Sequence, residues 1–246
     1  WDTLYAQELT NHSHDRTDTG TVWFDDSDAE TKTLSFLEEH ASADYGLDPA
    51  TASVLDLGCG NGSLLFALRD EGWEGRLVGV DYSEGSVELA RAVGRDRLAE
   101  AEDAEEEENE VEFLVWDVLA GPLDAVRPTA TTTANTQGWD LVLDKGTFDA
   151  ISLSDARDPL GRRVCEGYGA RVLALLRAGG IFLVTSCNWT EAELREWFDG
   201  KTVTAEEGTE TAKLRLAGRI QYPSFSFGGV KGQTISTLCF EKVVGA

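Results

Sequence analysis

The stretch VLDLGCGNG, Val54 to Gly62, decides the fold class of this chain. An apolar run leads through Asp56 into glycines 58, 60 and 62, and a helical pattern follows. Such glycines allow a tight turn and let a ligand touch the backbone. The spacing differs from the Gly-x-Gly-x-x-Gly of dinucleotide-binding enzymes, and the carboxylate of Asp56 would repel a pyrophosphate. We expect a ligand that carries an amine and a carboxylate; a plain strand-to-helix turn is the structural alternative.

Strand and helix patterns alternate on both sides of this loop. Strand patterns lie at 52–57, 76–80, 111–116, 141–143, 180–186, 213–220 and 234–243. Helical patterns lie at 63–71, 85–101 and 162–177, and the pairs Ser27/Glu30 and Thr190/Glu193 have capping-box spacing. The alternation predicts an α/β fold with a doubly wound, Rossmann-like seven-stranded sheet, mostly parallel with an antiparallel C-terminal hairpin. We expect one domain over 1–246, with insertions near 102–110 and 127–138.

Acidic residues end the second and third predicted strands. Asp81 lies about 20 residues beyond the glycine loop, where a carboxylate accepts hydrogen bonds from both hydroxyls of a ribose. Tyr82 beside it is placed either along an adenine ring or in the core. Asp117 is placed to receive the adenine amino group, with Val118 or Trp116 against the ring. Because open α/β sheets bind ligands at the carboxyl ends of their strands, these residues predict a nucleoside site.

The composition narrows the class of partner. Lys and Arg number 21 against 45 Asp and Glu, a net charge of −24. Such a chain repels phosphate backbones, so we expect no nucleic-acid partner. No apolar run approaches the ~18–20 residues of a membrane span, so we expect no association with a membrane. The cysteines at 59, 165, 187 and 239 have neither zinc nor disulfide spacing, which predicts reduced thiols in the cytoplasm and no metal site. We expect a monomer, since no apolar stripe is left over.

The glycine loop, Asp81 and the strand order together resemble the class I, seven-stranded S-adenosylmethionine-dependent methyltransferases. Four further segments resemble the lysine methyltransferases of translation elongation factor 1-alpha, the methyltransferase-like protein 10 group. These segments are WDTLYAQELTN with DTGTVWF near the start, DKGTFDAISL at 144–153, TSCNWT at 185–190 and FSFGG at 225–229. The chain departs from that pattern at Thr21, where a glutamate is usual, and at Asp25, where a glycine is usual.

The resemblance implies S-adenosylmethionine as cofactor and assigns residues to its site. The cofactor set is Asp56, Gly58, Cys59, Gly60, Asn61, Gly62, Asp81, Tyr82, Ser83, Asp117, Val118 and Asp144. The N-terminal segment 1–45 is expected to close over the cofactor through Trp23 and Phe24. The alternative is that both side chains only anchor the first helix in the core. Lys145, Phe148, Trp189, Phe225 and Phe227 are placed on the substrate side. For Phe225 and Phe227 plain packing is the alternative.

The predicted reaction is in-line attack of a lysine amine on the sulfonium methyl. A lysine pKa near ~10.4 leaves roughly one amine in 2,500 neutral at pH 7, a cost of about 4.6 kcal/mol. Desolvation beside a cation reduces that cost, and the proton is released to water. The protein then mainly positions the amine. We assign this aiming to Asp144 first and to Asn188 second.

The sequence leaves several functions open. Nucleic-acid methyltransferases that act on adenine commonly carry an Asn/Asp-Pro-Pro-aromatic stretch where this chain has Asp144-Lys145-Gly146-Thr147, which together with the net charge of −24 argues against base methylation. A basic elongation factor 1-alpha suits the acidic surface as a partner. The alternatives are a small-molecule methyltransferase on the same fold, a non-catalytic methyltransferase-like subunit and, remotely, a nicotinamide-dependent oxidoreductase.

Overall fold

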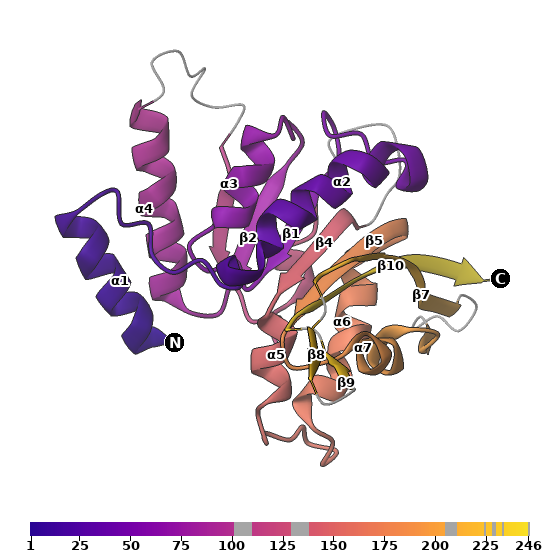
Figure 1. The fold of residues 1–246 in the computed structure, drawn as a ribbon. Coiled ribbons are helices and arrows are strands. Elements are labelled where there is room, and N and C mark those ends of the chain that lie inside the picture. The colour runs from indigo at the N-terminus through magenta and orange to yellow at the C-terminus, as the bar shows by residue number, and fades with distance from the viewer. Residues whose placement is uncertain are drawn as a thin grey trace.

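The computed structural model describes the chain except residues 101–109, 129–137, 205–210, 224, 228–229, 233 and 246. The expected insertions at 102–110 and 127–138 therefore lie almost entirely outside the described residues. Within the described part, eight strands form one sheet in the order β3-β2-β1-β4-β5-β10-β7-β6 (Figure 1). The strands are β1 Val54–Leu57, β2 Leu77–Asp81, β3 Glu112–Val115, β4 Trp139–Lys145, β5 Leu176–Ser186, β6 Thr202–Thr204, β7 Thr211–Ile220 and β10 Ser236–Gly245.

The pairing confirms the predicted sheet. Strands β1 to β5 run parallel, β10 is antiparallel to both β5 and β7, and β6 adds a short edge strand beside β7. A small separate hairpin, β8 Phe225–Phe227 with β9 Val230–Gly232, lies between the two long C-terminal strands in sequence. The seven predicted strands are thus all present, in a mostly parallel sheet that ends in an antiparallel hairpin.

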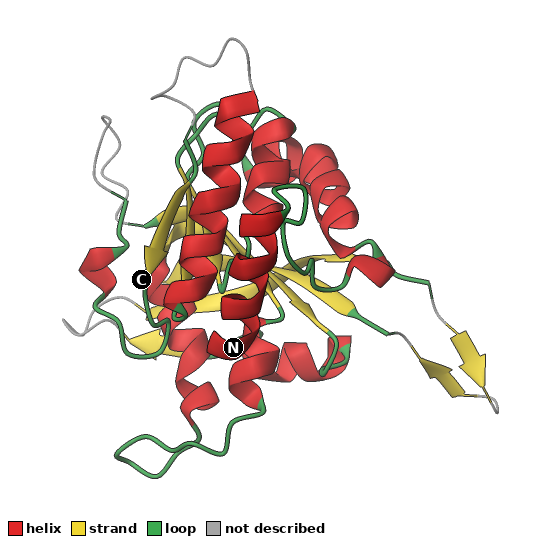
Figure 2. Cartoon of the chain, turned by 90° about the vertical axis from the view of Figure 1, so that its left-hand side faces the viewer, coloured by secondary structure: helices red, strands yellow, loops and turns green. Residues whose placement is uncertain are grey.

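Helices cover both faces of the sheet, as the side view in Figure 2 shows. The helices are α1 Asp2–His14, α2 Ala29–Tyr45, α3 Ser63–Asp70, α4 Glu84–Glu100, α5 Thr147–Ser152, α6 Tyr168–Leu175 and α7 Glu191–Phe198. Short 3-10 turns are η1 Asp25–Ser27, η2 Leu123–Ala125 and η3 Val164–Gly167. None of the described helices is both long and apolar enough to span a membrane.

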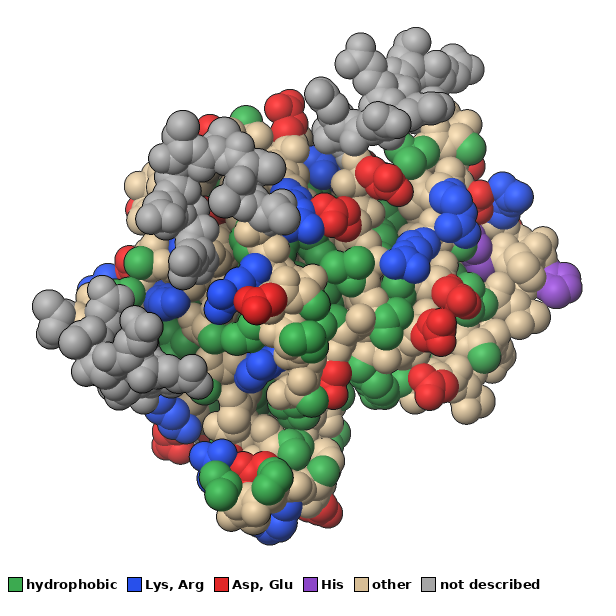
Figure 3. Space-filling view, turned by 180° about the vertical axis from the view of Figure 1, so that it is seen from behind, with side chains coloured by type: hydrophobic (Ala, Val, Ile, Leu, Met, Phe, Trp, Pro, Cys, Tyr) green, Lys and Arg blue, Asp and Glu red, His purple; other side chains and the backbone are tan. Residues whose placement is uncertain are grey.

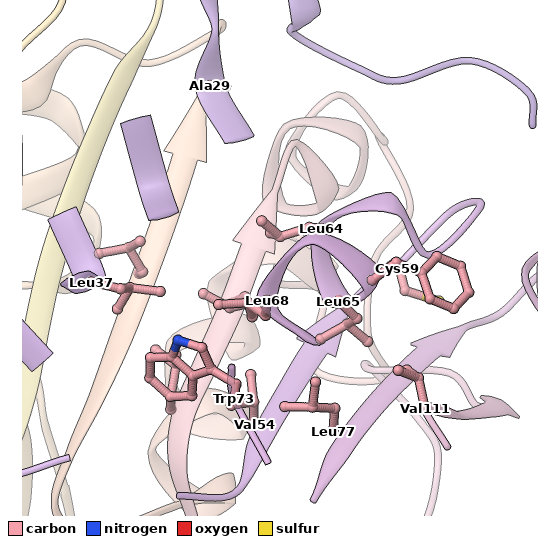
Figure 4. Close-up of a cluster of buried hydrophobic side chains, with 14 of the residues drawn as sticks. Ala29, Leu37, Val54, Cys59, Leu64, Leu65, Leu68, Trp73, Leu77 and Val111 are labelled. Carbon is pink, nitrogen blue, oxygen red and sulfur yellow. The ribbon is translucent and has the colours of Figure 1, made fainter. Parts of the chain in front are cut away.

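Alternate residues of the buried strands face two apolar layers, because strand side chains point to opposite faces in turn. Val54 packs with α2 and α3, in the layer drawn in Figure 4. Leu55, its neighbour, packs with α5, α6 and α7 in the opposite layer. Both side chains are fully buried. The glycine loop that follows is therefore held between two cores.

Two expected helix boundaries need correction. The helical pattern at 162–177 forms only η3 and α6, because β5 already begins at Leu176, which pairs with Trp139 of β4. Ser27 does not cap α2; the N-cap is Asp28, in a left-handed conformation with φ 52° and without a side-chain cap. Glu30 instead reaches another element, as described below. The capping box of Thr190 and Glu193 is confirmed at α7.

Candidate active site

The carboxyl ends of β1 to β4 meet at a cavity of about 610 Å³. Thirteen of the residues assigned to a site from the sequence line it: Trp23, Phe24, Gly58, Cys59, Gly60, Asn61, Asp81, Tyr82, Trp116, Asp117, Val118, Lys145 and Asn188. Others line it without having been assigned, among them Trp1, Tyr5, Thr147, Asp149, Leu153 and Cys187. The sheet edge predicted from the strand pattern is therefore where these side chains gather.

The glycine loop takes a conformation that side chains would prevent. Gly58 has φ 70°, and a Cβ there would lie 1.9 Å from the hydroxyl oxygen of Thr147. Gly62 has φ 82°, and a Cβ there would lie 2.6 Å from the ring of Phe113. Positive φ favours glycine because other residues meet steric strain. Gly62 thus serves packing behind the loop, while Gly58 and Gly60 line the cavity.

Asp81 ties the glycine loop to the start of α4. Its Oδ2 accepts hydrogen bonds from the Gly60 amide at 3.3 Å and the Ser86 hydroxyl at 2.9 Å, and its Oδ1 accepts one from the Ser83 amide at 2.9 Å. Burial raises the pKa of Asp81 above its usual value. Ser83 is buried and does not line the cavity. Because a carboxylate accepts up to about four hydrogen bonds, Asp81 retains capacity toward the cavity.

Asp56 and Asp144 lie behind the cavity wall on neighbouring strands. Both are almost fully buried, and burial raises the pKa of each to about 7. Among the described residues, Asp56 Oδ1 has no hydrogen-bond partner. Asp144 accepts hydrogen bonds from the amides of Thr147 and Phe148, at 2.8 and 3.0 Å, and from the Tyr168 hydroxyl at 2.5 Å. The structure therefore does not bring Asp144 to the place where it was expected to aim an amine.

Asp149 lies in the cavity wall instead. It is on α5, one turn beyond Gly146, the glycine that follows β4, and is 5% exposed. Its Oδ1 accepts a hydrogen bond from the Ser186 hydroxyl at 2.5 Å, and its Oδ2 accepts one from the Cys187 amide at 2.8 Å. The signal available in sequence was an acid between the apolar residues Phe148, Ala150 and Ile151 of the TFDAIS helix. Asp149, in the first turn of α5, and Asn188, two residues beyond β5, thus line the same cavity.

Two aromatic residues assigned to the substrate side belong to the packing. Phe148 is fully buried, with its ring centroid 5.3 Å from that of Tyr168. The indole N–H of Trp189 donates a hydrogen bond to the Ser152 hydroxyl at 2.9 Å, and its ring packs on Trp197. Neither side chain lines the cavity. The side chains of Phe225 and Phe227 lie outside the described part of the structure.

The N-terminal segment reaches the cavity from the opposite side. Helix α1 lies beside α4 in both ribbon views (Figures 1 and 2). Trp1, Trp23 and Phe24 line the cavity, and the Trp1 and Trp23 rings meet edge to face at 5.4 Å. Lys145 Nζ donates a hydrogen bond to the Trp23 carbonyl at 3.2 Å and lies 3.4 Å from Glu30 Oε1.

The Glu30 carboxylate extends this connection to the glycine-loop helix. Its Oε1 also accepts a hydrogen bond from the Ser63 hydroxyl at 2.6 Å. Lys145 is thus an anchor for the segment before α2, and Glu30 links that anchor to α3. Sequence spacing alone had suggested a local capping role for Glu30.

The charged side chains that line the cavity are mostly acidic, and they favour some classes of ligand over others. Its described lining contains Asp81, Asp117 and Asp149, and Lys145 as the one lysine or arginine. A pyrophosphate would find little compensation here, which argues against a nicotinamide dinucleotide. Hydroxyl and amine donors on a nucleoside or a cationic ligand fit better. No cluster of three or more metal-ligating side chains occurs among the described residues.

Comparisons with known proteins agree with this geometry. Residues 49–229 match the family model described as a methyltransferase domain. The chain is 40% identical over 242 residues to protein-lysine N-methyltransferase EFM4 of Saccharomyces cerevisiae, covering 98% of this chain and 92% of the relative. It is 30% identical over 243 residues to human EEF1A lysine methyltransferase 2, covering 99% and 84%.

A solved structure resembles the fold. Haemonchus contortus phosphoethanolamine N-methyltransferase 1, in complex with phosphoethanolamine and S-adenosylhomocysteine, superposes with a TM-score of 0.52 at 12% identity. The match covers 88% of this chain and 42% of that one, and it bears on the fold alone. The sequence matches extend over nearly the whole of both curated relatives. The chain therefore belongs to the methyltransferase-domain family, among the protein-lysine N-methyltransferases that include EFM4 and EEF1A lysine methyltransferase 2.

Proposed function

We propose that the protein is an S-adenosylmethionine-dependent lysine N-methyltransferase that modifies translation elongation factor 1-alpha. The names of the relatives supply the reaction and the protein substrate. The observation that carries the proposal is a single cavity lined by aspartates to which we assign two different roles. Asp81 and Asp117 line the part of the cavity that we assign to the nucleoside, and Asp149 and Asn188 line the same cavity from α5 and the residues after β5.

The residues present fit S-adenosylmethionine. Asp81 would accept hydrogen bonds from the ribose hydroxyls, and Asp117 would accept one from the adenine amino group. Gly58 and Gly60 leave room for the ligand to touch the backbone. The unpartnered Oδ1 of Asp56 is a nearby acceptor behind the loop. Trp23 and Phe24 of the segment 1–45 would close over the bound cofactor.

Asp149 takes the aiming role in our proposal. The cofactor supplies an electrophilic methyl group, and the amine must present its lone pair to it. Asp149, fixed by Ser186 and Cys187, would accept a hydrogen bond from the amine and so orient that lone pair. Asn188 lies beside it on the exposed rim. The proton of the lysine ammonium leaves to water before attack, so Asp149 need not act as a strong base.

The surroundings of the cavity suit a basic protein in a reducing compartment. The chain carries a net charge of −24, which favours encounter with a basic partner. All four cysteines are free thiols, as in cytoplasmic proteins. We accordingly propose a cytoplasmic, monomeric enzyme without nucleic-acid or membrane partners.

Mass spectrometry of elongation factor 1-alpha after incubation with the protein and S-adenosylmethionine tests the function. The expected result is methylation of one lysine, which also identifies the site and the number of methyl groups. Asp81→Asn is the control with impaired cofactor binding. Label from the cofactor that enters only low-molecular-weight material would instead indicate a small-molecule methyltransferase. Failure to bind the cofactor in calorimetry would indicate a non-catalytic subunit.

A further inference from the structure

The loop between α5 and η3, residues 153–163, projects from the body of the protein beside the cavity. Figure 1 shows it below α5, and Figure 2 shows it at the lower edge of the molecule. It carries the two most exposed large hydrophobic side chains in the described part of the chain, Leu153 at 72% and Leu160 at 77%. Ala156 and Pro159 are also exposed.

This projecting loop has a built conformation. The Asp158 amide and the Arg162 carbonyl are hydrogen bonded at 2.9 Å, as are the Val164 amide and the Ala156 carbonyl at 3.1 Å. Asp158 Oδ1 accepts hydrogen bonds from the amides of Leu160 and Arg162, both at 2.9 Å. The turn is therefore a hairpin that presents Leu160 at its tip. Because the turn is already ordered, a partner that covers it would pay little conformational entropy.

The arginines of the loop are used to build it. Arg157 donates to the Gly161 carbonyl at 2.7 Å, Arg162 pairs with Asp158 at 2.7 Å, and Arg163 donates to the Ser152 carbonyl. These contacts hold the hairpin together, while the side chains of Arg157 and Arg162 stay exposed to solvent. In the space-filling view from behind, the lobe at the bottom has hydrophobic side chains on its outer surface, together with basic and acidic ones (Figure 3). The loop carries three arginines against two aspartates on a chain with net charge −24, and its exposed leucines lie among these charges.

The loop is continuous with the cavity. Leu153, Ser154 and Ala156 belong to the cavity lining, and Leu160 lies beyond them at the tip. Whatever covers the tip therefore sits beside the entrance through which the amine must come. A second copy of this chain at that place would obstruct the substrate. The occupant that fits is the folded protein that carries the target lysine.

We propose that the hairpin at 153–163 is a docking element for the folded protein substrate. It binds an apolar patch next to the target lysine, with Leu160 as the outer contact and Leu153 at the cavity rim. The proposal rests on the proposed function. It predicts that recognition needs the folded substrate surface as well as the lysine itself.

Steady-state kinetics with purified elongation factor 1-alpha and the Leu160→Asp variant test the proposal. The expected KM for the protein substrate rises about tenfold, equivalent to about 1.4 kcal/mol, because the variant replaces a buried apolar contact by a charge. The kcat and the cofactor affinity should match those of the wild type, since Leu160 does not line the cavity. Val244→Asp is the matched control, because Val244 is exposed at the end of β10.

The possible results separate the docking role of the hairpin from dimer formation and from the proposed function. A wild-type KM in Leu160→Asp would overturn the docking role while leaving the proposed function standing. Dimers of the wild type that Leu160→Asp dissociates in sedimentation would overturn it in favour of a second copy. If the wild type methylates no elongation factor, the proposed function fails, and the docking role fails with it.

Discussion

The hydroxyl of Tyr168 donates a hydrogen bond to Oδ2 of Asp144, with 2.5 Å between the two oxygens. Both side chains are buried. The same carboxyl accepts the first two amides of α5, from Thr147 and Phe148. Asp144 is therefore the side-chain cap that joins β4 to α5, and Tyr168 of α6 holds it in place. Because α5 carries Asp149, this buried contact fixes the residue to which we assign the aiming of the amine.

Asp144→Ala should destabilise the fold. The change removes the cap and leaves two amides and the Tyr168 hydroxyl buried without that acceptor, at a cost of about 2–4 kcal/mol. Tyr168→Phe removes one donor only and should cost about 1 kcal/mol. Urea unfolding at neutral pH measures both. If Asp144→Ala unfolds with the wild-type midpoint but loses turnover, Asp144 acts on the substrate after all.

The buried carboxyls should make stability depend on pH. The folded-state pKa of Asp56 is about 7, against a usual value of 3.8. Between these values the folded state keeps a proton that the unfolded chain has lost, so this group stabilises the fold fully below pH ~4 and ceases to as pH rises through about 7. Asp56→Asn removes the titration. From pH ~5 to ~7, the free energy of unfolding of the variant should rise relative to the wild type by about 1 kcal/mol per pH unit. A pH-independent difference would contradict the raised pKa.

Asp149→Asn should lower kcat by about 100-fold, the usual loss when a positioned polar group at a reacting centre is removed. The isosteric amide keeps the volume, so cofactor affinity measured by calorimetry should change by about twofold or less. Glu71→Gln is the control, because Glu71 is an exposed acid at the end of α3, outside the hairpin at 153–163, and does not line the cavity. If Asp149→Asn keeps the wild-type turnover, Asp149 does not orient the amine, and Asn188 becomes the residue to which we assign that role.

Asp81→Asn should weaken cofactor binding by about 10- to 100-fold, since a hydrogen bond to a charged group contributes about 1.5–3 kcal/mol. Ser86→Ala separates this effect from loop packing, because Ser86 donates to the same carboxylate without lining the cavity. Calorimetric titration with S-adenosylmethionine measures both variants. Equal losses in the two would indicate that Asp81 acts by holding the Gly60 loop.

Lys145→Met should loosen the N-terminal segment. The Lys145 ammonium donates a hydrogen bond to the Trp23 carbonyl and forms an ion pair with Glu30. Loss of these contacts would free the segment before α2. Limited proteolysis near residues 21–24 should become faster, and cofactor affinity should fall about threefold or more, since one hydrogen bond is worth about 0.5–1.5 kcal/mol. Lys213→Met on the exposed side of β7 is the control. Unchanged cleavage would remove Lys145 from this anchoring role.

The sequence predicted the sheet well because local patterns carried the information. Apolar runs between segments of helical periodicity predicted seven strands that alternate with helices. The glycine spacing predicted a ligand site at the end of β1, where the cavity lies. Errors occurred where distant residues compete. Glu30 looked like a capping partner of Ser27, but Ser63 and Lys145 provide better partners from other elements. Leu176 looked helical, but its pairing with Trp139 draws it into β5.

The stretch DKGTFD illustrates the boundary between the two kinds of information. By itself the sequence determined that Asp144 ends a buried strand beside a ligand loop, since the strand and the glycine turn are local; Asp149, five residues further on, was not assigned to the site. Only the tertiary structure decided which acid faces the cavity. The left-handed turn at Gly146 and the hydroxyl of Tyr168, 24 residues further along, bury Asp144. The amide of Cys187 and the hydroxyl of Ser186 hold Asp149 at the wall. The direction of a side chain at a strand end depends on partners that no local pattern specifies.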